Sequence, residues 1–148
     1  MKLQTASSVI SLAKELEGKA AEFYQDLAKR YVQGKDAFLA FAQENKKNIV
    51  QIERAYYGVI SDAIEGCYAF NLESDDYTLK TTLAKGASYS EALDTAVRME
   101  EMVTGFYTRA AEQSKCLMAD VPRAFSLVAR KRGERLVRLK TLQAEQDY

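Results

Sequence analysis

Apolar residues recur every three or four positions along four long stretches of the chain, which is the spacing of an amphipathic α-helix. The pattern stops between these stretches, where Gly, Ser, Asp and Asn gather. It predicts two pairs of helices, each pair joined by a short loop, with a long irregular connector between the pairs. The predicted bounds are residues 7–32, 36–65, 89–115 and 121–146 for the helices and 67–88 for the connector.

Local signals mark several of the predicted helix ends. Ser88 is followed three residues later by Glu91, which is the spacing of a capping box. Asp36 and Asp120 are predicted N-caps of the second and fourth helices, because a short acceptor side chain there binds free backbone N–H groups. Gly34 is the predicted C-terminal cap of the first helix. Together these signals predict an all-α fold, in which residues 1–148 form a single domain.

The two helix pairs match each other in sequence. Glu17 and Tyr24 of the first helix correspond to Glu100 and Tyr107 of the third, at a shift of 83 residues. The second and fourth helices match at a shift of 87 residues, with Ile49, Val50 and Ile52 corresponding to Leu136, Val137 and Leu139. Such a repeat predicts an internal pseudo-twofold axis. The connector is long enough to reset the chain direction, which predicts a four-helix bundle with one long crossover.

Polar residues interrupt the apolar face of every predicted helix. They are Glu17, Asn45, Asn48, Glu100, Arg132 and Arg135. At 100° per residue, Arg132 lies near the centre of its stripe, whereas Arg135 lies toward the edge, where solvent exposure is the alternative to burial. Buried polar groups are costly unless they are paired, so we expect these side chains to meet one another. Tyr24 and Tyr107 are expected to pack beside them, with each hydroxyl bound to a partner.

The motifs around these residues resemble those of the ferritin-like, rubrerythrin-type carboxylate proteins. The stretch Glu17-x-x-Ala20-x-x-Phe23-Tyr24 is similar to the first helix of that family, and Ser90-Glu91-Ala92-Leu93-x-x-Ala96-x-x-Met99-Glu100 to its third. The resemblance extends from Ser7 to about Gln143. It implies a ferritin-like bundle, in which each half supplies one Glu and one Glu-x-x-His pair to hold two iron or manganese ions.

The chain departs from this implied ligand set at four of its six positions. Glu17 and Glu100 keep the family residue, Asn45 and Arg132 stand where the resemblance implies Glu, and Asn48 and Arg135 stand where it implies His. The chain contains no His at all, which removes the commonest metal ligand. We therefore expect a degenerate di-iron site without a metal cofactor.

Charge arithmetic suggests what replaces the metals. Two carboxylates and two guanidinium groups sum to zero, as do four carboxylates and two divalent ions. We hypothesise that Arg132 and Arg135 fill the metal space and pair with Glu17 and Glu100, because a guanidinium binds a carboxylate through two N–H groups. An alternative is a carboxylate-rich site that binds a hard cation through oxygen. Its residues are Glu17, Glu44, Glu100 and Glu134.

The composition mainly argues against certain partners, locations and catalytic groups. Lys plus Arg equals Asp plus Glu at 21 each, so the net charge gives no reason to expect nucleic acid or an anionic membrane as a partner. No 18-residue apolar run and no signal peptide are evident, which predicts a cytoplasmic protein. Cys67 and Cys116 have no neighbouring His to activate them, so we expect non-catalytic thiols, while a disulfide between them stays open.

Three functions are compatible with these observations. The first is a non-enzymatic, metal-free ferritin-like protein that acts through self-association, such as a homodimer, or through a protein partner. The second is a rubrerythrin-like oxidoreductase that retains iron or manganese. The third is a small-anion binder that uses Arg132 and Arg135 in the bundle centre.

Overall fold

The computed structural model describes residues 1–59, 70–115 and 120–146. The fold is all-α, and its long helices pack as two hairpins, α1 with α2 and α4 with α5, which meet through α2 and α5 to form a bundle. The helices are α1 (Ala6–Arg30), α2 (Lys35–Val59), α4 (Tyr89–Gln113) and α5 (Asp120–Gln146). The prediction of an all-α four-helix bundle is confirmed. The predicted end of the second helix at residue 65, and both cysteines, lie outside the described residues.

The helix starts confirm one predicted cap and correct two. The backbone N–H of Glu91 donates to Ser88 Oγ at 3.1 Å, so Ser88 is the N-cap of α4. Helix α2 already begins at Lys35, which places Asp36 in its first turn instead of at its N-cap. Helix α5 includes Asp120 as its first residue. Both carboxylates still lie at the positive end of a helix dipole, where they are favourable.

The turn between α1 and α2 corrects the predicted role of Gly34. Helix α1 ends at Arg30 with Tyr31 as its C-cap, so Gly34 does not cap it. Instead the main chain at Gly34 lies against two aromatic side chains. An added Cβ would be 2.7 Å from the ring of Phe38 and 2.7 Å from the hydroxyl of Tyr89. The glycine is therefore required by close approach and not by helix termination.

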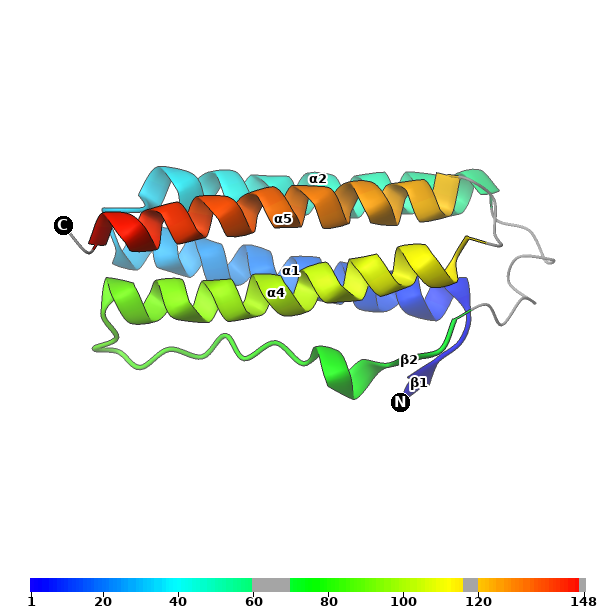
Figure 1. The fold of residues 1–148 in the computed structure, drawn as a ribbon, viewed down its shortest axis with the longest axis horizontal. Helices are drawn as coiled ribbons and strands as arrows, with labels where there is room; N and C mark the ends of the chain where they lie inside the picture. Colours follow the sequence, from blue (N-terminus) through cyan, green and yellow to red (C-terminus); the bar gives the residue numbers. More distant parts are fainter. Residues whose placement is uncertain (60–69, 116–119, 147–148) are drawn as a thin grey trace.

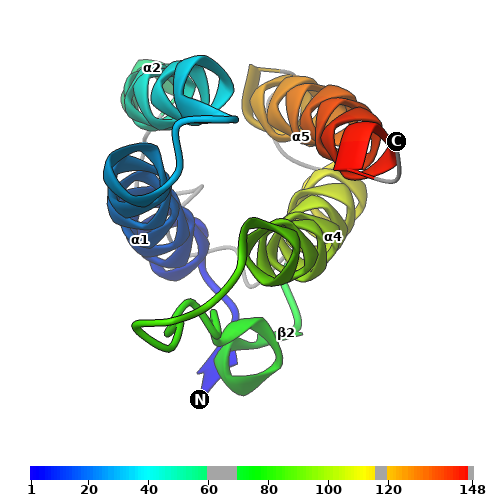
Figure 2. The same cartoon turned by 90° about the vertical axis from the view of Figure 1, so that its left-hand side faces the viewer.

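The connector runs along the outside of α1 and α4 and returns the chain to the other end of the bundle (Figures 1 and 2). It contains the short strand β2 (Leu72–Glu73) and the 3-10 helix η1 (Ser74–Tyr77). Strand β2 pairs antiparallel with β1 (Lys2–Leu3). This strand pair was not predicted, because two residues are too few to show a period.

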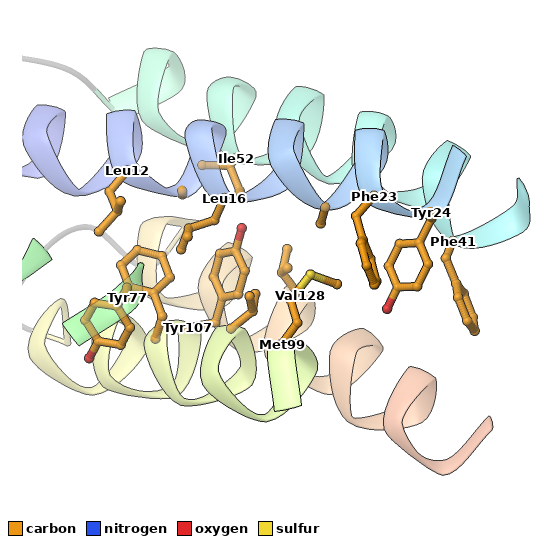
Figure 3. Close-up of a cluster of buried hydrophobic side chains, with 14 of the residues drawn as sticks. Leu12, Leu16, Phe23, Tyr24, Phe41, Ile52, Tyr77, Met99, Tyr107 and Val128 are labelled. Atoms are coloured by element: carbon orange, nitrogen blue, oxygen red, sulfur yellow. The ribbon is translucent and has the colours of Figure 1, made fainter. Parts of the chain in front are cut away.

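The core lies between the inward faces of the helices, with aromatic side chains grouped at both ends of the stretch drawn in Figure 3 and Met99 and Val128 between them. Tyr24 from α1 and Tyr107 from α4 are both fully buried and point in opposite directions across the bundle. None of the helices in the described part of the chain is long and apolar enough to cross a membrane. The polar residues discussed next lie within this core.

Candidate functional site

The structure brings all six polar residues of the predicted inward faces together inside the bundle. They are Glu17, Asn45, Asn48, Glu100, Arg132 and Arg135. The first five are 0% exposed, and Arg135 is 2% exposed. The alternative in which Arg135 reaches solvent is therefore wrong. Its side chain turns inward because carboxylate and carbonyl acceptors on neighbouring helices are within hydrogen-bond reach. We call these six residues the central cluster.

Arg132 of α5 bridges the two buried carboxylates. Its Nη2 lies 2.6 Å from Glu17 Oε2 on α1, and its Nη1 lies 2.6 Å from Glu100 Oε1 on α4. Burial alone would lower the pKa of Arg132, but the charges of Glu100 and Glu17 outweigh burial and raise that pKa. Arg132 therefore stays cationic and holds α1, α4 and α5 together by two charged hydrogen bonds.

Arg135 binds one turn further along α5 and reaches toward α2. Its Nη1 donates to Asn45 Oδ1 at 2.7 Å and to Glu100 Oε1 at 3.1 Å. Its Nη2 lies 2.6 Å from Glu44 Oε1, whose side chain is 34% exposed. The guanidinium also lies over the ring of Phe41, with Cζ 4.9 Å from the ring centroid. Arg135 thus links the buried cluster to a carboxylate at the bundle surface.

The two tyrosines bind the carboxylates crosswise. Tyr24 on α1 donates to Glu100 Oε1 on α4 at 2.6 Å, and Tyr107 on α4 donates to Glu17 Oε1 on α1 at 2.8 Å. Burial raises the pKa of both phenols well above 10, and the charges of the bound carboxylates raise these pKa values further. The sequence repeat relates Tyr24 to Tyr107 and Glu17 to Glu100, and it therefore implies such a reciprocal pair of hydrogen bonds between α1 and α4.

The amides of α2 satisfy only part of the cluster. Asn48 Nδ2 donates weakly to Glu17 Oε1 at 3.4 Å. Several buried atoms have no hydrogen-bond partner among the described residues, namely Asn45 Nδ2, Asn48 Oδ1, Glu100 Oε2, Thr104 Oγ1, Arg132 Nε and Arg135 Nε. A buried polar group without a partner costs free energy. We therefore expect the cluster to specify how the helices meet more than to stabilise the fold.

The residues present do not fit a pair of metal ions. Two guanidinium groups lie among the carboxylates and would repel a cation, and the chain has no imidazole to offer. Among the described residues, no group of three or more Cys, Asp or Glu is placed to hold a metal. The predicted alternative site of Glu17, Glu44, Glu100 and Glu134 is not assembled. Glu134 is exposed on α5, and Glu44 is bound to Arg135.

The fold and this site define a four-helix bundle with a buried ionic centre. No protein-family model, curated protein or solved structure matches the chain. The ferritin-like family and the assignment of the cluster as former metal-site positions therefore stay predictions.

Proposed function

We propose that this chain is a non-enzymatic, metal-free, ferritin-like protein related to rubrerythrin, which acts by binding another protein chain, either a second copy or a partner. In this proposal the central cluster replaces a di-metal site. The observation that carries it is Arg132, which occupies the space between Glu17 and Glu100 with a hydrogen bond to each. In this proposal the guanidinium of Arg132 neutralises the two buried carboxylates, as bound metal ions do in a carboxylate protein.

Accessibility also supports a non-enzymatic role. Each residue of the central cluster is at most 2% exposed. A substrate would reach Glu17 or Glu100 only if the helices separated, and separation would break the contacts of Arg132 with both carboxylates. The guanidinium groups that a small anion would use already bind Glu17, Glu44 and Glu100.

Metal content tests the proposal. The protein is expressed in medium supplemented with iron and manganese, purified, and measured by elemental analysis before and after loading with each metal. We expect far less than one ion per chain and no turnover of peroxide after iron loading. One stoichiometric iron or manganese ion per chain, or peroxide turnover, overturns the proposal in favour of the oxidoreductase.

A gain-of-function variant tests the ferritin-like frame itself. Its four substitutions restore the ligand types that the resemblance implies, namely Asn45→Glu, Asn48→His, Arg132→Glu and Arg135→His. With six ligands in place, we expect this variant to bind about two ions per chain. If the variant is helical and folded but binds no metal, the correspondence with the ferritin-like family is wrong.

A further inference from the structure

Helix α2 carries a line of exposed apolar side chains on its solvent-facing side. Leu39 is 40% exposed, Val50 46% and Tyr57 63%. At 100° per residue these three positions fall within about 20° of one line, which extends for about 27 Å along the helix. Val32, 86% exposed, lies just before the helix. These four residues, which we call the α2 stripe, are most of the exposed large hydrophobic residues in the described part of the chain.

Five cations that make no ion pair within the described part of the chain flank the α2 stripe. A hollow of about 290 Å³ beside Val32 and Leu39 includes Lys29 and Lys35 in its lining. A second hollow of about 560 Å³ surrounds Val50 and is lined by Lys46, Lys47, Gln51 and Arg54. None of these five cations makes an ion pair with a described residue, whereas Glu44 and Glu53 of α2 are bound by Arg135 and Lys14. Asp36 is the remaining acidic residue of α2.

The other half of the molecule supplies an internal control. The hairpin of α4 and α5 has a hollow of about 330 Å³ at the place related by the repeat, and polar residues dominate its lining. Three residues of the α2 stripe, Val32, Leu39 and Tyr57, correspond there to Lys115, Ser126 and Ala144, at the shifts of 83 and 87 residues. The fourth residue, Val50, corresponds to the exposed Val137. The same helix packing therefore tolerates polar or small residues at three of the four positions, so packing alone does not explain the apolar ones.

We propose that the α2 stripe is the docking site for an acidic amphipathic helix of a partner protein. The apolar side of that helix would cover Leu39, Val50 and Tyr57, while its carboxylates would pair with Lys46, Lys47 and Arg54. A second copy fits less well. Two α2 stripes facing each other around Val50 would bring the lysines and Arg54 of both copies together without enough acidic residues between them. This docking site rests on the proposed function, in which the chain acts by binding another protein chain. It specifies the binding surface and the chemistry of the partner.

A synthetic peptide of about 18 residues, which matches the span from Leu39 to Tyr57, is a direct probe. The acidic peptide has Leu at helical spacing with Glu on both sides of the Leu face, and a control peptide has Lys at every Glu position. Binding is measured by fluorescence anisotropy in low and high salt. We expect the full-length protein to bind the acidic peptide alone, with weaker binding at high salt. In the Leu39→Ser protein we expect about a tenfold loss of affinity.

Matched variants make the test specific. Leu39→Ser introduces the residue that the repeat already carries at the corresponding position on α5, so the fold should tolerate it. Val137→Ser removes an apolar residue that is 67% exposed on α5 and should leave peptide affinity unchanged. No binding of the acidic peptide at about 200 µM, or equal binding of the Lys peptide, overturns the inference.

Sedimentation of the unliganded protein distinguishes the second-copy alternative. A dimer that dissociates in the Leu39→Ser variant would make a second copy the occupant and overturn the inference. The proposed function fails separately, because metal content is measured on the same preparation. A metal-containing protein that still binds the acidic peptide would refute the metal-free proposal and leave the docking site standing.

Discussion

Helices α1 and α4 present the same two side chains to the bundle centre, a glutamate and, two turns later, a tyrosine. Their hydrogen bonds are reciprocal, from Tyr24 to Glu100 and from Tyr107 to Glu17. Helices α2 and α5 break this symmetry, because two amides on α2 face two guanidinium groups on α5 at corresponding positions. One half of the molecule therefore supplies both of the cations that neutralise the carboxylates of the two halves.

A position just outside the cluster also differs between α2 and α5. Arg135 binds Glu44 of α2 at 2.6 Å. The position on α5 that corresponds to Glu44 is Lys131, at the shift of 87 residues. An arginine at position 48 of α2 would meet this lysine instead of a carboxylate. From this comparison we expect charge balance with the neighbouring helix, and not the symmetry of the bundle, to favour arginines on α5.

The substitution Arg132→Met removes the cation that the two halves of the molecule share, and it should have the largest effect on stability. It leaves Glu17 and Glu100 buried without their shared cation, and removal of one partner from a buried ion pair costs about 3–5 kcal/mol. Urea unfolding at neutral pH measures the loss. The control is the triple variant Glu17→Gln, Glu100→Gln and Arg132→Met, which buries no unpaired charge at these positions and should recover most of the loss. A loss under about 1 kcal/mol in the single variant would show that Arg132 does not hold the carboxylates.

Moving the arginines to α2 tests the role of Glu44. The variant Asn45→Arg, Asn48→Arg, Arg132→Asn and Arg135→Asn keeps the net charge of the cluster. We expect a loss of about 2–4 kcal/mol, because the new arginine at position 48 faces Lys131. Adding Glu44→Lys and Lys131→Glu should restore most of this stability, as measured by urea unfolding. If the first variant is already as stable as the natural chain, α2 and α5 carry the arginines equally well and Glu44 does not favour either helix.

Tyr24→Phe sharpens the comparison between α1 and α4. It removes a hydrogen bond to a charged carboxylate and should cost about 1.5–3 kcal/mol at pH 8. The matched variant Tyr107→Phe should cost a similar amount, because its bond to Glu17 is the counterpart. Unequal losses, differing by more than about 1.5 kcal/mol, would show that the reciprocal bonds are not equivalent.

The same two phenols should make the free energy of unfolding fall at alkaline pH. Their folded-state pKa values lie well above 10, so the folded protein retains protons that the unfolded chain releases above pH 10. The stability they contribute is complete below pH 10 and is lost as the pH rises through the folded-state pKa values. The slope is about 1.4 kcal/mol per pH unit for each tyrosine. Urea midpoints between pH 9 and 11 should fall less steeply in Tyr24→Phe, and an unchanged slope would contradict this.

Glu44→Gln should have the smallest effect of the series. The side chain of Glu44 is 34% exposed, so solvent screens its pairing with Arg135, which keeps Glu100 and Asn45 as acceptors. We expect a loss of about 1 kcal/mol, and less at high salt. Glu53→Gln is the matched control on the same helix, because its pair with Lys14 is more exposed and should contribute less. An equal loss of stability in both variants would show that the pair of Glu44 with Arg135 contributes no more than an exposed surface ion pair.

Much of the fold could be predicted from the sequence because the relevant signals are local. Helical periodicity is repeated over many turns, so small errors in phase average out, and the described helices start within one residue of the predicted positions. The same phase is enough to place Glu17, Glu100 and Arg132 on inward faces, since each lies among buried apolar neighbours on its own helix.

Features that depend on another helix or on very short segments could not be predicted. Arg135 lies at the edge of its own stripe, and its burial follows from Glu44 and Asn45 on α2, which the phase of α5 cannot reveal. The pairing of β1 with β2 joins residues about 70 positions apart through only two residues on each side. The position of Gly34 against Phe38 and Tyr89 likewise depends on how α1, α2 and α4 meet.

The covalent attachment of Arg132 to α5 has a consequence for how the protein depends on its surroundings. A bundle held by a bound ion loses stability when the free concentration of that ion falls below its dissociation constant. Arg132 is always present beside Glu17 and Glu100 at the same local concentration, whatever the medium supplies. On the proposed metal-free function, the folded fraction of this chain should therefore be the same in metal-starved and metal-replete cells and should not respond to chelators.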